Sequence, residues 1–482
     1  PKEELAQLNF IPTVPEFVEW ISEKWADRVA VSNLEVSYTY AEFGKRIARR
    51  RAFLNSLGIK KGDKVAIFER NSIDAIEMFL AATSAGYVAI NLPSMLPGPA
   101  VVGCCARFDV SVLVVRDEFK EAVAGAPCKV VPSASIADVE APVAVVDRNE
   151  PAAIFFTGGT TGAPKGAILP HRAIMRGSFN ALYAPGAQLT GDRYIAFLPL
   201  SHVFGLIAST LGAFYRGATW FAAEDMKATI GKIPVIKPTK LVLVPGLCEV
   251  LIGLTKMYGP QFLGGQLKAI ITGAALVPPR LGVEFNKLYI EFYQGYGMTE
   301  GANLTSANAN VSEKPASVGK IYPEQEAKIV DGELWYRGDN TFLGYYKDPE
   351  NTAATLTEDG WVKTGDLARF DEDGFLYITG RIKNIIILAN GENISPEVIE
   401  DRYYKYPTVR DCLVKEVVEN GEGVIAIEIL PLMQAFEGKT PQEIEAYFRN
   451  LVEEVNAASP SVQRVTKLII RTEDFKRTGS LK

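Results

Sequence analysis

The strongest constraint on the fold is a series of short, uninterrupted apolar runs that alternate with segments of helical periodicity. Lys64–Glu69 (KVAIFE) is one such run, and Asn71 is the candidate N-cap of the helix that follows it. That helix is predicted to carry one apolar face made of Ile73, Ile76, Phe79, Leu80 and Thr83. The other predicted strands are Tyr87–Leu92, Val110–Val115, Lys240–Val244, Lys268–Thr272 and Leu288–Tyr293. Because continuous apolar strands that alternate with helices are typical of a parallel sheet covered on both faces, the sequence predicts an α/β fold.

The pattern changes after about residue 330, where short strands are separated by glycine and aspartate turns. The predicted strands there are Gly332–Tyr336, Leu376–Thr379 and Ile385–Leu388. Beyond the tight-turn pair Asn390-Gly391, Ser395-Pro396 and the capping box Thr440–Glu443 each open a helix. We therefore predict a large N-terminal domain at 1–380 with parallel-rich sheets layered with helices. A boundary segment at 381–384 then leads into a small α+β C-terminal domain at 385–482.

Composition excludes several classes of protein. A length of 482 residues exceeds one ordinary core, and a net charge of −6 argues against a nucleic-acid partner. The five cysteines are odd in number and form no C-x-x-C pair, which argues against a disulfide framework or a zinc site. The start, residues 1–9, is acidic and polar, unlike a signal peptide. Tyr194–Tyr215 carries no charged side chain, but Pro199, Ser201 and His202 interrupt it, so we expect a buried segment of a cytoplasmic protein and no transmembrane span.

The segment Phe155–Gly166 (FFTGGTTGAPKG) is the most informative about function. Glycines let backbone N–H groups surround a polyphosphate, threonine hydroxyls add donors, and a lysine supplies a positive charge. The residues in these roles are Thr157, Gly158, Gly159, Thr160, Thr161, Gly162 and Lys165. The string is not a Walker A loop, and its other interpretation is a flexible surface turn. Its density of glycine, threonine and lysine favours a phosphate-binding loop.

Five further motifs follow in a fixed order: Pro199–Gly205 (PLSHVFG), Thr272–Ala275 (TGAA), Gln294–Glu300 (QGYGMTE), Lys363–Leu367 (KTGDL) and Gly380–Asn384 (GRIKN). Together with the phosphate loop they resemble the adenylate-forming, or AMP-binding, superfamily. That superfamily includes acyl- and aryl-CoA synthetases, peptide-synthetase adenylation domains and firefly luciferase. The pattern is most similar to that of acyl-CoA synthetases and fatty-acid–CoA ligases, and the resemblance extends from about Tyr38 to Lys482.

The resemblance implies a site for ATP and Mg²⁺. The implied adenine contacts are Gly273, Ala274, Ala275, Gln294, Gly295, Tyr296, Gly297 and Met298. Thr299 is implied at the α-phosphate, and Glu300, with Thr157, at the metal, since a carboxylate is a hard oxygen ligand suited to Mg²⁺. The implied ribose and phosphate contacts are Asp366, Ile378 and Arg381. Without the resemblance, Tyr296 would be interpreted as a core aromatic, Glu300 as a surface acid and Asp366 as a turn residue.

The resemblance also implies a two-step reaction with a mobile C-terminal domain. The carboxylate of the substrate would attack ATP to give acyl-AMP and pyrophosphate, and a thiol would then attack the acyl-adenylate. Lys482, in Phe475–Lys482 (FKRTGSLK), matches the catalytic lysine of the family, Lys383 the hinge and Gly391 the loop that admits the thiol. His202 matches a family position beside the acyl and phosphate groups, where it orients the carboxylate or forms a pocket wall, whereas His171 is interpreted as structural.

The acid and its acceptor are less constrained. The resemblance implies that a member of the family that activates amino acids would carry an Asp in the segment after the His motif, where it pairs with the α-ammonium group. Val203–Thr219 contains no acidic residue, which argues against an amino acid and favours a neutral fatty or aromatic acid. The candidate acyl pocket is Val203, Phe204, Val244, Gly246, Gly273 and Gly295. The acceptor is expected to be coenzyme A, with a carrier-protein phosphopantetheine as the alternative. Luciferase-like oxygenation and a non-catalytic ATP-binding regulator remain as further alternatives, and the enzyme is expected to be a monomer or homodimer.

Overall fold

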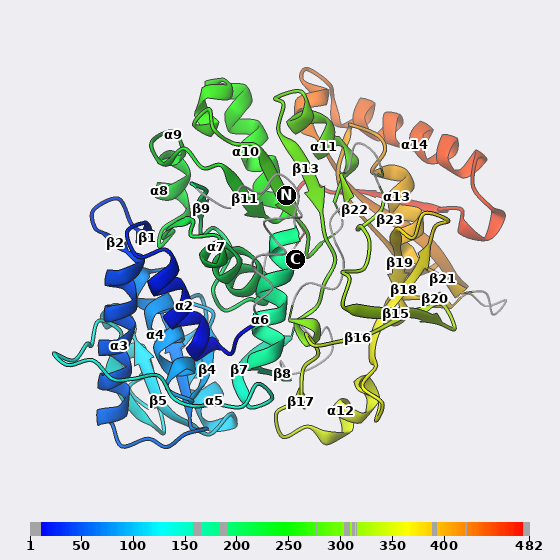
Figure 1. Cartoon of the computed structure of the whole chain (residues 1–482). Helices are drawn as coiled ribbons and strands as arrows, with labels where there is room; N and C mark the ends of the chain where they lie inside the picture. Colours follow the sequence, from blue (N-terminus) through cyan, green and yellow to red (C-terminus); the bar gives the residue numbers. More distant parts are fainter. Residues whose placement is uncertain are drawn as a thin grey trace.

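The structure is a computed structural model that describes residues 11–157, 165–183, 191–275, 277–302, 309–310, 314, 316–387, 393–419 and 422–475 (Figure 1). Its largest sheet has seven strands in the order β17-β8-β7-β4-β3-β5-β6. These strands are β3 (Lys64–Phe68), β4 (Val88–Leu92), β5 (Val110–Val115), β6 (Lys129–Pro132), β7 (Pro151–Thr157), β8 (Lys165–Pro170) and β17 (Gly344–Tyr345). The five strands from β6 to β7 are parallel, whereas β8 and β17 are antiparallel additions. The predicted parallel α/β architecture and its first three strands are confirmed.

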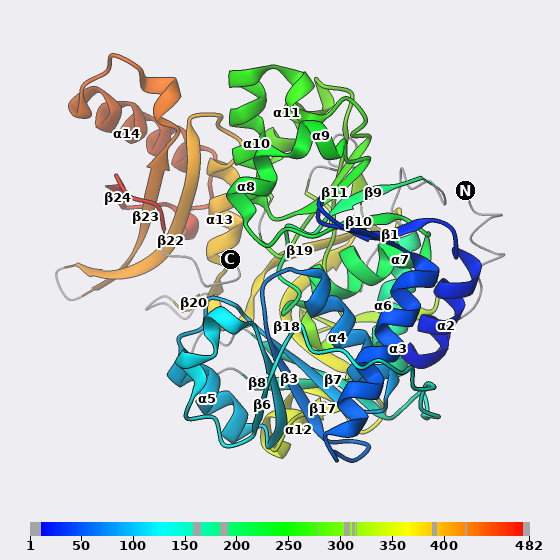
Figure 2. The ribbon, with the colours of Figure 1, turned by 90° about the vertical axis from the view of Figure 1, so that its left-hand side faces the viewer.

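Alternating side chains of this sheet enter two different cores, because successive residues of a strand point to opposite faces. In β3, Val65 and Ile67 join the core on the face of α4 (Ile73–Ser84), and Ala66 and Phe68 join the core on the face of α5 (Gly98–Arg107). Two more helices, α2 (Val14–Lys24) and α3 (Tyr40–Ser56), pack with α4 (Figure 2). Helices therefore cover both faces, which explains why the strands are uninterrupted apolar runs.

Helix α4 differs from its prediction in two respects. Its N-cap is Ser72, whose hydroxyl accepts from the Ala75 N–H, rather than Asn71. The Asn71 amide instead donates to the carbonyls of Ala196 at 2.7 Å and Leu198 at 2.8 Å. The helix is also buried on all sides except at Asp74, so its apolar residues do not mark one face. Both differences arise because distant segments pack onto the helix.

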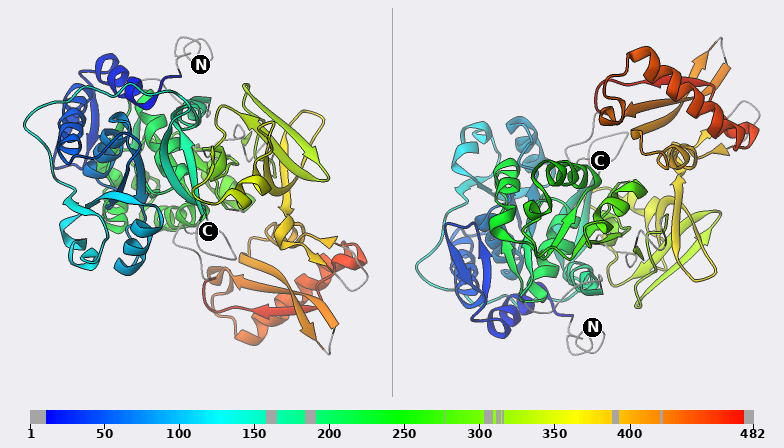
Figure 3. Two further views of the ribbon diagram at one scale, coloured as in Figure 1. Left: turned by 90° about the horizontal axis from the view of Figure 1, so that it is seen from below. Right: turned by 90° about the horizontal axis from the view of Figure 1, so that it is seen from above.

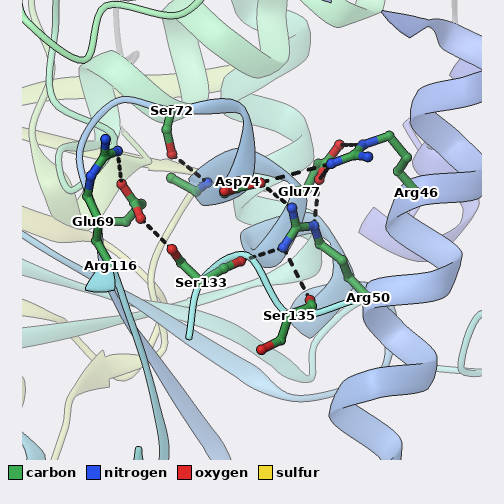
Figure 4. A network of polar contacts seen from close by, with 10 residues as sticks. Arg46, Arg50, Glu69, Ser72, Asp74, Glu77, Arg116, Ser133 and Ser135 are labelled. Carbon is green, nitrogen blue, oxygen red and sulfur yellow. Dashed lines mark hydrogen bonds and ion pairs between the residues drawn. The ribbon is translucent and has the colours of Figure 1, made fainter. Parts of the chain in front are cut away.

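The carboxyl ends of β3, β5 and β6 carry a network of polar side chains (Figure 4). Glu69, after β3, accepts from the Arg116 guanidinium at 2.9 Å and from the Ser133 hydroxyl at 2.6 Å. Beside it, Arg50 of α3 donates to Glu77 of α4 at 2.5 Å. Open α/β sheets commonly bind ligands where the strand order reverses, which here is between β3 and β5. The protein's own charged side chains occupy that position, so the network has the character of a structural centre.

Two smaller sheets complete the first part of the chain. One has the order β2-β1-β10-β9, with bounds Ser37–Thr39, Val29–Ser32, Thr219–Phe221 and Arg193–Ile195. The other has the order β11-β12-β13-β14, with bounds Lys240–Leu243, Ala269–Thr272, Glu291–Gln294 and Ala309–Asn310. Strand β13 begins three residues later than the predicted Leu288, because Tyr289 has a left-handed backbone (φ 60°) that a strand cannot accommodate.

The charge-free segment Tyr194–Tyr215 is buried, as predicted. It contains most of β9, a π-helix at Phe204–Leu211 and α7 (Gly212–Tyr215). Among the residues described, no helix has the length and apolar character needed to cross a membrane. The remaining α-helices described before residue 360 are α6 (His171–Asn180), α8 (Met226–Gly231), α9 (Ile233–Ile236), α10 (Pro245–Tyr258), α11 (Pro279–Asn286) and α12 (Pro349–Thr355).

An antiparallel sheet leads toward the C-terminal lobe. Its strands are β15 (Gln325–Val330), β16 (Glu333–Gly338), β18 (Val362–Phe370) and β19 (Leu376–Arg381). The lobe follows a single 3-10 turn at Ile382–Asn384 and lies beside the rest of the chain (Figure 3). Its elements are β20 (Ile386–Ile387), β21 (Asn393–Ile394), α13 (Pro396–Tyr403), β22 (Val409–Glu419), β23 (Glu422–Pro431), α14 (Pro441–Ala457) and β24 (Lys467–Ile470).

The lobe has a hydrophobic cluster of its own, formed by residues between Ile386 and Val465. Thr440 and Glu443 form the predicted capping box at the start of α14. The α+β pattern of this region is therefore confirmed, and the division at 380 and 385 stays a prediction.

Candidate active site

The phosphate-loop motif lies in the hairpin between β7 and β8. Thr157 ends β7, Lys165 begins β8, and the two residues are directly paired across the ladder. The five predicted contacts between them, Gly158, Gly159, Thr160, Thr161 and Gly162, lie outside the described residues. The hairpin thus places a threonine and a lysine side by side at the two ends of the glycine-rich segment.

Lys165 is held by residues from a distant part of the chain. Its ammonium donates to the Asn351 side-chain oxygen at 2.5 Å and lies 5.0 Å from the centre of the Tyr345 ring. Tyr345 reaches this position because β17 pairs with β8, with Tyr345 opposite Ala167. A cation over an aromatic face is attracted by the ring quadrupole, so the ring and the amide together fix the direction of the lysine.

Glu300 lies in a 3-10 turn at Thr299–Gly301 and is only 6% exposed. Its carboxylate accepts a hydrogen bond from the Tyr345 hydroxyl at 2.5 Å. Burial raises the pKa of the Glu300 carboxyl, while the Tyr345 hydroxyl and the charges of Lys165 and Arg381 act in the opposite direction. Tyr345 therefore connects the predicted metal ligand to the predicted phosphate-binding lysine.

The predicted adenine contacts come from two adjacent parallel strands. Gly273 and Gly295 directly follow β12 and β13, and the Gly295 N–H donates to the Thr272 carbonyl at 3.0 Å. A Cβ atom on Gly273 would lie 2.8 Å from the Gly295 carbonyl oxygen, so this close approach requires glycine. Ala274 has a left-handed backbone, with φ 67°. The structure thus brings the Thr272–Ala275 and Gln294–Glu300 motifs together at one edge of the sheet.

The predicted ribose carboxylate, Asp366, is buried and contacts two other predicted site residues. The Tyr296 hydroxyl donates to one of its oxygens at 2.5 Å, and the Arg381 guanidinium lies 2.8 Å from the other. Arg381 reaches it because β18 and β19 pair Asp366 with Arg381. Burial, followed by the charge of Asp366, raises the pKa of the Tyr296 phenol. Three predicted nucleotide contacts therefore form one cluster, with Ile378 half-buried on β19.

The other predicted residues are more dispersed. Val203 and Phe204 are buried at the start of the π-helix, just after the half-buried His202. Val244 is buried before α10, whereas Gly246 is exposed. His171 is buried and its Nδ1 accepts from the Val14 N–H at 3.3 Å, a structural role as predicted. Lys383 lies in the exposed turn Ile382–Asn384, and Gly391 and Lys482 lie outside the described residues.

Two residues with direct contacts to the site were absent from the predicted set, Tyr345 and Asn351. Their signal in the sequence is weak, because Gly344-Tyr345-Tyr346 resembles any aromatic strand and Asn351 lies inside a short helix. The glycine at position 344 is a sequence signal for an unusual backbone conformation next to Tyr345, since its φ of 132° is accessible chiefly to glycine. Their importance becomes visible only through the pairing of β17 with β8.

The donors in this site suit a magnesium nucleotide. A buried carboxylate at Glu300 and a hydroxyl at Thr157 are the oxygen ligands that Mg²⁺ prefers, and Lys165 supplies positive charge for phosphate. Asp366 supplies an acceptor for ribose hydroxyls. These residues therefore fit both Mg²⁺ and a nucleotide.

Comparisons with known proteins agree with this geometry. Residues 18–346 match the family described as AMP-binding enzyme, and residues 383–480 match the AMP-binding enzyme C-terminal domain. A long-chain-fatty-acid–CoA ligase, FadD15 of Mycobacterium bovis, is 28% identical, over 92% of this chain and 88% of that protein. A feruloyl-CoA synthase from an Amycolatopsis species is 30% identical, over 80% of this chain and 82% of that protein. The solved structure of the anthranilate CoA ligase AuaEII with anthranoyl-AMP shares the fold, with a TM-score of 0.85, 19% identity and coverage of 99% of this chain and 96% of that one.

Proposed function

Because the chain belongs to the AMP-binding enzyme family, we propose that it is an AMP-forming ligase that joins a carboxylic acid to coenzyme A. The observation that carries this proposal is the position of Tyr345, whose hydroxyl contacts Glu300 and whose ring contacts Lys165. A buried oxygen ligand and a fixed cation beside a glycine-rich loop are what MgATP requires. The relatives named above are ligases of the same type, which favours coenzyme A over a carrier-protein phosphopantetheine as the acceptor.

In the first half-reaction this chain would act mainly by binding and charge stabilisation. Glu300 and Thr157 would hold Mg²⁺, which neutralises phosphate charge when bound. Lys165 and Thr299 would hold the phosphates, and Asp366 with Arg381 the ribose. Lys482 would bring a positive charge to the attacking carboxylate and the α-phosphate, where negative charge accumulates in the transition state. His202 would orient the carboxylate or form part of the pocket wall.

In the second half-reaction the C-terminal lobe would rotate about Lys383, with residues 1–380 as the core and 385–482 as the moving domain. The separate hydrophobic cluster of the lobe and the single exposed turn at Ile382–Asn384 support this division. Gly391 would then enter the site with the thiol. We also propose that the enzyme acts in the cytoplasm, where all five cysteines, each free in the structure, would stay reduced.

The acid is proposed to be neutral and apolar, since Val203, Phe204 and Val244 are buried apolar side chains. The named relatives include a fatty-acid ligase and an aromatic-acid ligase, so both classes belong in the test. The experiment is acid-dependent ATP–pyrophosphate exchange over a panel of fatty, aryl and amino acids, followed by addition of coenzyme A. If no acid stimulates exchange, the proposal is wrong. If an acid is adenylated but coenzyme A is never acylated, the carrier-protein acceptor replaces it.

The role of Lys482 can be separated from that of the rest of the site. Lys482→Ala is expected to abolish exchange and largely preserve thioester formation from supplied acyl-AMP, because the α-phosphate is attacked only in the first step. Loss of both half-reactions would contradict this role. A matched control is Lys467→Ala on β24 of the same lobe, which is expected to preserve both half-reactions.

A further inference from the structure

Tyr345 is fixed in place by contacts on several sides. Its backbone N–H donates to the Thr352 hydroxyl at 2.8 Å, and its ring packs edge-on against Phe342 with 5.1 Å between ring centres. The residue is only 7% exposed. A side chain held in this way has little freedom to rotate, so the direction of its hydroxyl is set by the fold rather than by a ligand.

The hydroxyl of Tyr345 is directed at a single carboxylate. It donates to Oε1 of Glu300, and burial together with the charge of Glu300 raises the pKa of the Tyr345 phenol. The phenol therefore keeps its proton throughout the physiological pH range and remains a donor. Because this hydrogen bond joins a fixed hydroxyl to one oxygen of a buried carboxylate, it sets the orientation of the Glu300 carboxylate.

The ring of Tyr345 acts on a second charged group. The Lys165 ammonium lies 5.0 Å from its centre and also donates to Asn351. One residue on β17 thus contacts both a carboxylate from the turn Thr299–Gly301 and a lysine from β8, which are far apart in the sequence.

We propose that Tyr345 is a positioning residue of the adenylation half-reaction, whose hydroxyl orients the Glu300 carboxylate for Mg²⁺ and whose ring orients Lys165 toward the phosphates. This inference rests on the proposed function. Glu300 would hold the metal ion with its carboxylate while Oε1 accepts the hydrogen bond from Tyr345. The simpler interpretation is that Tyr345 is a core aromatic that contributes packing alone. In that case loss of its hydroxyl would leave metal binding unchanged, whereas a positioning role requires metal binding to weaken.

The test compares two tyrosine-to-phenylalanine variants. Tyr345→Phe keeps the ring that packs on Phe342 and Lys165 and removes only the hydroxyl. Tyr336→Phe is the matched control, because Tyr336 is fully buried and its hydroxyl has no hydrogen-bond partner within the described structure. Thermal unfolding of both variants establishes that each is folded.

The first measurement is binding of Mn²⁺ in the presence of a non-hydrolysable ATP analogue, followed by electron paramagnetic resonance. Tyr345→Phe is expected to bind Mn²⁺ about ten-fold more weakly than the wild type, a loss typical of one hydrogen bond to a charged group. Tyr336→Phe is expected to bind within two-fold of the wild type. Equal Mn²⁺ binding by the two variants would overturn the inference.

A double substitution tests whether the effect passes through Glu300. In the background of Glu300→Gln, Tyr345→Phe is expected to cause no further loss of Mn²⁺ binding, whereas an undiminished ten-fold loss would show that Tyr345 acts by packing. Thr352→Val, which removes the acceptor of the Tyr345 N–H but keeps the phenol, is expected to give a smaller loss and provides a second variant should Tyr345→Phe not fold. Wild-type binding by Thr352→Val in that case would contradict the inference.

The Mn²⁺ measurement separates failure of this inference from failure of the proposed function. Equal Mn²⁺ binding by Tyr345→Phe and Tyr336→Phe would reject the role of the hydroxyl. Absence of exchange by the wild-type enzyme with every acid would instead reject the proposed function, so the two failures are distinguishable.

Discussion

Two buried carboxylates in this protein have very different surroundings. Glu77 accepts from the guanidinium groups of Arg46 and Arg50, and the side chains of Arg50 and Glu77 are 1% and 0% exposed (Figure 4). Glu300 is nearly as buried, but the side chain that contacts its carboxylate is a neutral phenol. The first charge is neutralised within the fold. For the second, no hydrogen bond or ion pair within the described residues joins the Glu300 carboxylate to a cation.

This difference indicates a division of labour. A charge that is neutralised by its neighbours contributes to the structure and has little left to offer a ligand. A charge that is buried beside a neutral donor lowers stability until a ligand supplies the opposite charge, which is a common property of functional sites. The contrast therefore predicts opposite effects when each carboxylate is replaced by an amide.

The largest effect is expected from Glu77→Gln. It leaves the buried Arg50 guanidinium without the Glu77 carboxylate and with Asp74 as its remaining acidic partner. Loss of one partner of a buried ion pair lowers the free energy of unfolding by about 3–5 kcal/mol. Urea unfolding followed by tryptophan fluorescence measures it. The paired variant Arg50→Met with Glu77→Leu is expected to lose less, since it removes the buried guanidinium and the buried carboxylate together. A Glu77→Gln loss below about 1 kcal/mol would show that the network is not structural.

Glu300→Gln is expected to act on activity rather than stability. Loss of the metal ligand should reduce kcat/KM in the exchange reaction about 100-fold, or about 2.7 kcal/mol. A carboxylate whose folded-state pKa is raised loses stability as pH rises from its unfolded value through the folded one. The amide removes that loss, so the melting temperature at pH 7–8 should be equal to or above that of the wild type. A lower melting temperature would contradict the comparison. Glu326→Gln, on an exposed pair with Arg337, is the control expected to change neither quantity.

Glu400 tests whether a raised pKa alone identifies a functional carboxylate. It lies on α13 of the C-terminal lobe, where burial raises its pKa to about 8, and it accepts from the Val414 N–H at 2.7 Å. Because the folded-state pKa is raised, its contribution to stability is present below about pH 4.5 and lost as pH rises through 8. Glu400→Gln keeps an acceptor for Val414 and should reduce the fall in melting temperature between pH 5 and 9 by a few degrees. Exchange activity should be unchanged. A large loss of activity would show that Glu400, like Glu300, is a functional carboxylate.

The smallest effect is expected from Arg449→Ala on α14. Arg449 and Glu445 form an exposed pair one helical turn apart, with side chains that are 65% and 49% exposed. Such pairs contribute at most about 0.5 kcal/mol, because solvent screens the charges. Urea unfolding should therefore agree with the wild type within error. A loss comparable to that of Glu77→Gln would show that burial does not separate the two kinds of charge.

Local sequence patterns predicted the elements well and their ends less well. The run Val110–Val115 became β5 without change, and Thr440 with Glu443 capped α14, because strand periodicity and capping depend on near neighbours. Asn71 failed as an N-cap because its amide bonds carbonyls more than a hundred residues away. The start of β13 failed because the turn before it contains a left-handed tyrosine. Both errors have the same kind of cause. A distant contact or an unusual backbone conformation overrides the local sequence pattern, and the pattern contains no information about either.

The sequence by itself determined the α/β class, the order of the motifs and the chemical types at the site, because strand periodicity, glycine-rich loops and hard oxygen ligands are local properties. Only the tertiary structure decided which groups meet. Lys165 and Glu300 meet at Tyr345, and Asp366 meets Tyr296 and Arg381, through the pairing of β17 with β8 and of β18 with β19. Contacts of this kind depend on strand order and register, which are set by packing of the whole chain.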